Sequence, residues 1–324
     1  MIMQGGKRGI PNWAIERLSD ALKTRRRVKE TMEWFVRYPS NRSNFNSIEH
    51  WEREIRYQCI EQVDSSPRPF FRKKISLPWI NIVHWDGYQR ENALKKIIGG
   101  APNAFFFVIL LRRLNDWVPQ VRDTATTEII RIAQETPSDI VSQGLYGILP
   151  HWRSWSRINN AQRQVIIDLI SSPQVIDKIR LHFCCHYSGI PVATFMECAR
   201  LPVFDKYLLG IAHKARQPSF RAKAYRSLFE QRISWCNGIS RMKPIIEHRS
   251  IDVPIVFETL LKQASIDPSP HVRSLAAEIL IKELPTLGGQ AMEYAELFNK
   301  DDSKSVYERG DFALRKLKLI GKVN

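Results

Sequence analysis

A short pattern of apolar and small residues recurs along this chain and predicts its architecture. In the clearest copy Val121 and Arg122 are followed by Ala125 and then by Ile129. Residues four and eight apart lie on one face of a helix, so the pattern marks a helix face that packs closely against a neighbour. Related copies begin at Gln89, Phe220, Val272 and Val306, so that consecutive copies are 32, 99, 52 and 34 residues apart.

The same helix face repeated five times indicates stacked helical hairpins. The copies differ in detail, because Gln89 replaces the aliphatic residue in one and Tyr307 replaces the arginine in another. Loop residues such as Pro137, Pro218 and Gly288-Gly289 separate the apolar segments, and no regular succession of short alternating segments indicates strands.

A break rich in proline, aromatic and basic residues at 65–74 divides the chain. We therefore predict an N-terminal helical segment at residues 1–76 and a repeat array at residues 77–324. The apolar run Ala104–Leu111 is far shorter than the roughly 20 residues that span a bilayer, and it predicts a buried helix.

Two segments resemble HEAT repeats, in which the second helix of the unit typically starts with Asp-x-x-x-x-Val-Arg-x-x-Ala. They are Asp116–Ala125 and Asp267–Ala276. The resemblance implies an all-α fold, namely a right-handed α-solenoid of HEAT-like helical hairpins. Residues 1–76 would form an N-terminal helical cap on this solenoid. By itself the family implies binding or scaffolding rather than catalysis.

The arginines of the pattern admit two interpretations. They can form a row that binds phosphates, or they can pair with an aspartate of their own or the neighbouring repeat, as the resemblance implies. We favour the second interpretation because Asp116 and Asp267 are suitably placed. The arginines are Arg90, Arg122, Arg221 and Arg273.

The net charge is +16 and the isoelectric point is near 9.8, which favours an anionic partner. Half of this excess lies between residues 206 and 243, which hold nine cations and one acid, Glu230. Binding to a polyanion would relieve the repulsion within this basic tract. We predict that Lys214, Arg216, Lys223 and Arg226 bind a nucleic-acid backbone, with a solvated basic face as the alternative.

Two N-terminal clusters carry the same chemistry. Arg25, Arg26 and Arg27 follow an amphipathic segment, and Arg72, Lys73 and Lys74 follow Phe70-Phe71. Rings beside cations suit stacking on bases and contact with phosphates. The alternative for the first cluster is a solvated helix end. The alternative for the second is that Phe70-Phe71 anchors the following helix.

No cofactor and no metal site is predicted. His182 and His186 are one helical turn apart and Cys185 shares their side, but a structural zinc site needs four ligands and no second pair follows. Five scattered cysteines and the lack of a secretory signal predict a reducing, cytoplasmic location without a membrane span.

No catalytic motif is present. We therefore predict a non-catalytic protein that captures the backbone of nucleic acid, DNA ahead of RNA, on a basic solenoid surface. One alternative is a protein-interaction scaffold subunit of a bacterial multi-protein system, such as a defence system, that binds an acidic partner. The other is a HEAT-like alkylpurine DNA glycosylase, since Trp117 lies beside Asp116 and Trp152 and Trp155 follow.

Overall fold

A computed structural model describes residues 52–53, 55–60, 77–185, 192–240, 243–287 and 289–320. Their contacts divide the chain into two compact units, residues 1–179 and 180–324, which are described separately. The boundary predicted near residue 76 falls at 61–76, outside the described residues.

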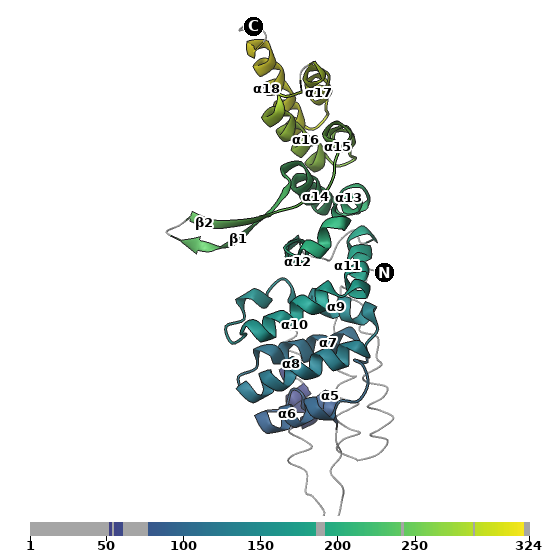
Figure 1. Cartoon of the computed structure of the whole chain (residues 1–324), viewed down its shortest axis with the longest axis vertical. Helices are drawn as coiled ribbons and strands as arrows, with labels where there is room; N and C mark the ends of the chain where they lie inside the picture. Colours follow the sequence, from purple (N-terminus) through teal and green to yellow (C-terminus); the bar gives the residue numbers. More distant parts are fainter. Residues whose placement is uncertain are drawn as a thin grey trace, which may run out of the picture. The chain divides into compact units, whose positions relative to one another are not determined.

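Unit 1 consists of helices in two rows (Figure 1). Helices α6, α8 and α10 pack side by side in one row, and α7 packs against α9 in the other. A π-helical turn, η2 (Arg56–Ile60), contacts α5. The bounds are α5 Pro78–Asn81, α6 Gly87–Lys96, α7 Ala104–Arg112, η3 Arg113–Asn115, α8 Pro119–Gln134, α9 Ser138–Ile148, η4 Trp152–Ser154, α10 Asn160–Ser171 and α11 Pro173–Cys185, which crosses the division.

Unit 2 repeats this arrangement. Helices α14, α16 and α18 pack in a row, and each packs against the helix before it, α13, α15 or α17. The bounds are α12 Val192–Ala199, η5 Pro202–Phe204, α13 Asp205–Lys214, α14 Pro218–Glu230, β1 Arg232–Ser240, β2 Lys243–Ser250, α15 Phe257–Ser265, α16 Pro270–Glu283, α17 Gln290–Phe298 and α18 Lys304–Ile320.

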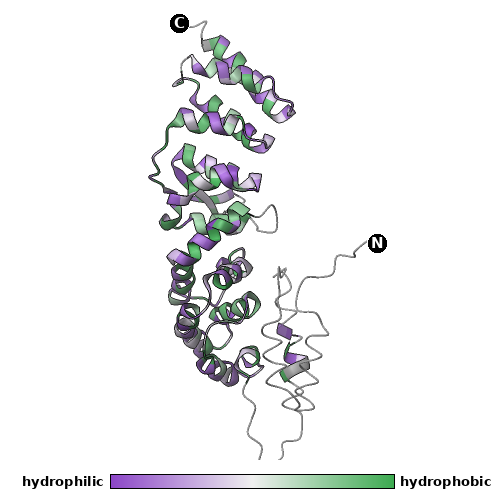
Figure 2. Cartoon of the chain, turned by 90° about the vertical axis from the view of Figure 1, so that its right-hand side faces the viewer, coloured by the Kyte–Doolittle hydropathy of each residue, from purple (hydrophilic) through white to green (hydrophobic). Residues whose placement is uncertain are grey.

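Apolar residues form the buried core of both units. Apolar and polar residues alternate along the helices in Figure 2. Every residue of Ala104–Leu111 is buried, which confirms the predicted core helix. The small residue of the pattern allows close packing: a Cβ added to Gly310 would lie 2.4 Å from the backbone nitrogen of Asn299. In unit 2, four buried phenylalanines form one cluster with ring centroids 4.9–6.1 Å apart, namely Phe183, Phe195, Phe204 and Phe220.

The arginines of the pattern connect consecutive helix pairs through one repeated arrangement, which we call a rung. In a rung the Nε and Nη2 atoms of an arginine donate to both carboxylate oxygens of an aspartate from the next pair. The three pairs are Arg90–Asp116, Arg221–Asp267 and Arg273–Asp301, with distances of 2.6–3.0 Å. Such bidentate pairs are the strongest and most directional of protein ion pairs.

The third arginine nitrogen, Nη1, donates to two backbone carbonyls of the loop before its own helix. These carbonyls belong to the residues five and six positions earlier, at 2.8–3.2 Å, and Arg90, Arg122, Arg221 and Arg273 all make both bonds. The guanidinium therefore fixes the loop of one pair to the helix start of the next.

Each aspartate of a rung also shapes the start of its own helix. Oδ1 of Asp116, Asp267 and Asp301 accepts a bond from the backbone nitrogen two residues later, at 2.8–3.0 Å. All three lie three residues before the first residue of α8, α16 or α18. The predicted pairing with aspartates is thus confirmed for Arg90, Arg221 and Arg273. Arg122 bonds only to backbone carbonyls among the described residues.

A long antiparallel hairpin, β1–β2, interrupts the helices of unit 2. The sequence analysis did not predict it. The turn signal Asn237-Gly238 lies within β1, where the register shifts, and not at the tip. In addition β2 is mostly exposed, so it shows no alternation of apolar and polar residues.

The base of the hairpin is attached to the loop between α12 and α13. The Arg249 guanidinium donates to the carbonyls of Ala199 and Leu201 and to the Asp205 carboxylate. The Arg200 guanidinium lies 4.9 Å from the Trp235 ring centroid. These contacts hold a two-stranded ribbon that would be marginally stable alone.

We expect the Asp267→Ala substitution to destabilise the protein by about 3–5 kcal/mol, because it leaves the buried Arg221 guanidinium without its carboxylate. Urea unfolding followed by circular dichroism measures this loss. Replacing Glu308, which pairs with Lys304 at the surface, should cost no more than about 1 kcal/mol. Equal losses for the two variants would show that the rungs do not stabilise the array.

Candidate anion-binding site

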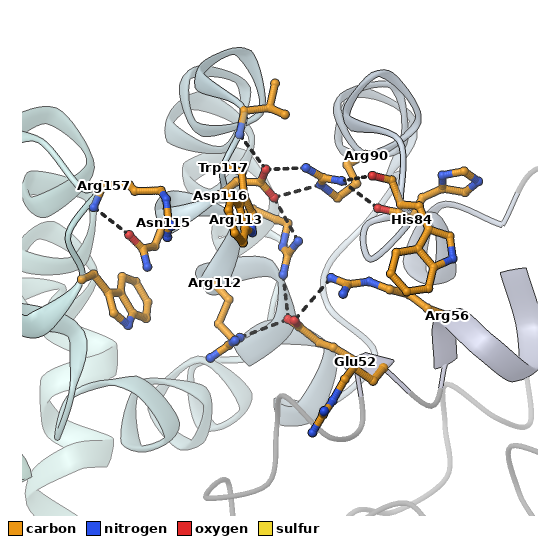
Figure 3. A pocket seen from close by; sticks show the side chains of 14 residues that line it. Glu52, Arg56, His84, Arg90, Arg112, Arg113, Asn115, Asp116, Trp117 and Arg157 are labelled. Carbon is orange, nitrogen blue, oxygen red and sulfur yellow. Dashed lines mark hydrogen bonds and ion pairs between the residues drawn. The ribbon is translucent and has the colours of Figure 1, made fainter. Parts of the chain in front are cut away.

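A cavity of about 780 Å³ opens in unit 1 beside the Arg90–Asp116 rung (Figure 3). Residues from the helical segment before η2, from the loops that precede α6 and α8, and from the loop before α10 surround it. Its lining consists of Glu52, Arg53, Arg56, His84, Trp85, Arg90, Arg112, Arg113, Asn115, Asp116, Trp117, Val118, Trp155 and Arg157.

Six of these residues are arginines and two are acids. Arginines therefore exceed acids in the lining by four. A concave surface lined by charge of one sign concentrates its field and attracts counter-ions. The cavity is therefore suited to an anion.

Glu52 is buried at the bottom of this arrangement. Its Oε1 accepts bonds from Arg112 Nε at 3.1 Å and Arg113 Nη2 at 2.6 Å, while Oε2 lies 3.8 Å from Arg56 Nη2. Burial opposes ionisation, but the attraction of Arg113, Arg112 and Arg56 outweighs it and lowers the pKa of Glu52. The side chain is thus a carboxylate that organises three arginines.

Asp116 is also fully engaged. Oδ1 accepts from Arg90 and from the backbone of Val118, and Oδ2 accepts from Arg90 and Arg113. Burial opposes its ionisation, but the Arg90 hydrogen bonds and the Arg113 charge prevail, and the pKa of Asp116 is lowered. With four bonds accepted, this carboxylate has no lone pair left for a substrate, which disfavours it as the base of a glycosylase.

Exposed indole rings line the mouth of the cavity. Trp85 is 51% exposed and Trp117 is 78% exposed. Arginines lie against both rings, with Arg56 5.3 Å from the Trp85 centroid and Arg157 4.4 Å from the Trp117 centroid. Guanidinium groups beside rings combine anion binding with a planar apolar surface.

The arginines of the pattern explain why these two tryptophans face outward. Each indole belongs to the residue five positions before such an arginine, and its carbonyl accepts a bond from Arg90 or Arg122. The backbone is held inward by this bond, and the side chain is left outside. Trp85 and Trp117 therefore occupy equivalent places in consecutive repeats.

The predicted residues of the basic tract lie in unit 2. Lys214, Arg216 and Lys223 are exposed, in or next to helices α13 and α14. Arg226 instead donates to Glu278 through both terminal nitrogens, at 3.0 and 2.7 Å, and also contacts Glu230. Arg221 and Arg232 contact Asp267 and Glu230, so Arg221, Arg226 and Arg232 are paired internally.

The two N-terminal clusters, Arg25, Arg26 and Arg27 and then Arg72, Lys73 and Lys74, lie outside the described residues. Conversely, no sequence pattern predicted Arg53, Arg56, Arg112, Arg113 or Arg157 at the site. Of the other residues in the lining, Arg90 belongs to the repeated pattern, and the glycosylase alternative named Asp116, Trp117 and Trp155.

Within the described ranges, no three histidine, cysteine or acidic side chains gather into a potential metal site. None of the helices described here combines the length and the apolar character needed to cross a membrane. No protein-family model, curated protein or solved structure matches this chain.

The Glu278 carboxylate gives a pH-dependent prediction. The hydrogen bonds from Arg226 lower the pKa of Glu278 from 4.5 to about 2. A depressed pKa stabilises the folded state above the unfolded value, and this contribution is lost as the pH falls toward the folded value. We expect the free energy of unfolding to fall between pH 4.5 and about 2, and to fall less in the Glu278→Gln variant. Parallel acid profiles of the two proteins would contradict this.

Proposed function

We propose that this chain is a HEAT-like α-solenoid that binds nucleic acid without catalysis, and that the cavity of unit 1 is its principal contact. The repeated rungs support the solenoid, because they join one helix pair to the next by the same atoms each time. The observation that carries the binding proposal is the excess of four positive charges around exposed indoles.

This combination of residues suits nucleic acid better than a simple anion. Guanidinium groups match phosphate oxygens in geometry and charge. Indole faces stack on bases of any sequence. Phosphate contacts position the ligand without reading its sequence, so the proposed binding depends little on base sequence.

The test is fluorescence anisotropy with random-sequence single-stranded DNA, single-stranded RNA and duplex across a salt series. Binding should weaken steeply with salt, since neutralised phosphates release their counter-ions. Arg53 is exposed at the cavity, and Arg53→Glu should weaken binding about tenfold at low salt and reduce the salt slope by about 1.

Two further variants locate the surface. Lys262→Glu on the exposed side of α15 changes the charge equally and should leave the affinity nearly unchanged. The triple change of Lys214, Arg216 and Lys223 to Glu tests the basic tract of unit 2. If the triple variant loses binding and Arg53→Glu does not, the cavity is the wrong surface. No binding at low salt to any of the three ligands would overturn the proposal.

One observation favours a protein partner as the second candidate. Ile245 and Ile246 on β2 are 44% and 56% exposed, although isoleucine is usually buried. Copurification with the wild-type chain, compared with an Ile245→Ser, Ile246→Ser variant, tests this scaffold function. A partner lost only in the variant would support it.

A further inference from the structure

Between α8 and α10 the structure has no complete rung, because the residue at the position of the aspartate carries the opposite charge. In the complete rungs an aspartate lies three residues before the first residue of the next helix. Helix α10 begins at Asn160, so the equivalent residue is Arg157. An arginine thus replaces the aspartate at the one place where it should pair with Arg122.

Arg122 keeps half of the rung arrangement. Its Nη1 donates to the carbonyls of Asp116 and Trp117 at 2.8 and 3.2 Å, as in the complete rungs. Its Nε and Nη2 atoms, which elsewhere hold the aspartate, bond to no carboxylate in the part of the chain that the structure describes. The guanidinium is therefore oriented for a bidentate oxyanion that none of the described residues provides.

The loss of the aspartate does not leave the helix start unsupported. Asn159 and Gln162 form a reciprocal capping box, in which Asn159 Oδ1 accepts from the Gln162 backbone and Gln162 Oε1 accepts from the Asn159 backbone. Asn159 and Gln162 therefore cap α10 in place of the aspartate, and Arg157 makes no capping contact.

Arg157 is instead held toward the cavity. Its backbone nitrogen donates to Asn115 Oδ1 at 3.0 Å, and its guanidinium lies over the Trp117 ring. The side chain is exposed and forms part of the cavity lining (Figure 3). Both Arg122 and Arg157 thus contact Trp117, one through its carbonyl and the other through its indole.

We propose that Arg122 and Arg157, joined by Trp117, form a specific phosphate site. A tetrahedral oxyanion would take the place of the rung carboxylate on Arg122 and would be neutralised further by Arg157. This inference rests on the proposed function, in which the phosphate is a phosphodiester of nucleic acid. A free phosphate has the same chemistry and is distinguished in the experiment.

The substitution Arg157→Asp restores the residue of a regular rung. The new carboxylate should pair with Arg122, raise the thermal unfolding midpoint by about 2–4 °C, and exclude phosphate. Arg157→Gln removes the charge without providing a partner, so it should weaken phosphate binding without raising the midpoint. Lys262→Asp controls for the change in net charge.

Two measurements are made on each full-length protein. The first is the rise of the unfolding midpoint with inorganic phosphate, compared with chloride at equal ionic strength. The second is the affinity for single-stranded DNA by anisotropy, which should fall about tenfold or more in Arg157→Asp. The wild type and Lys262→Asp should respond to phosphate, and Arg157→Asp should not.

The outcomes separate this inference from the function on which it rests. If phosphate stabilises the wild type but not Arg157→Asp and no nucleic acid binds, the site exists and takes free phosphate, and the proposed function fails. If DNA binds the wild type and Arg157→Asp equally, the function stands and the site is wrong. An Arg157→Asp midpoint at or below that of Arg157→Gln would also overturn the proposed rung geometry.

Discussion

The bidentate contact between an arginine and the aspartate of the next helix pair organises this protein. Because the same guanidinium also binds two loop carbonyls, three elements are fixed by one side chain. The aspartate in turn starts its own helix. Its bidentate geometry makes the contact directional, and burial makes it costly to break. Packing of apolar faces supplies the general attraction between helices, and the rungs set their register.

The cavity follows from this arrangement. The arginines of the pattern bind the carbonyl of the residue five positions earlier, whose side chain is exposed, and in two consecutive helix pairs that residue is tryptophan. The carboxylates of Glu52 and Asp116 are surrounded by arginines, and the six arginines of the lining outnumber the two acids. A structural network thereby produces a surface with excess positive charge.

Much of the architecture could be predicted from the spacing of residues. The buried helix at Ala104–Leu111 and the partners of Arg90 and Arg221 follow from periodicity and from the position of Asp116 and Asp267. The cavity could not be predicted, since Arg112 and Glu52 meet across 60 residues without a local signal. The pairing of Arg226 with Glu278, 52 residues away, escaped notice for the same reason.

The two ends of each rung belong to different helix pairs, which affects how the chain can be divided into fragments. A cut placed in the loop before α15, between Arg221 and Asp267, separates a guanidinium from its carboxylate although no helix is broken. Within the described residues, the segment from Arg122 to Arg221 contains no complete rung, and the division at Ile179 lies inside it. A fragment that ends in that segment therefore separates no rung arginine from its aspartate.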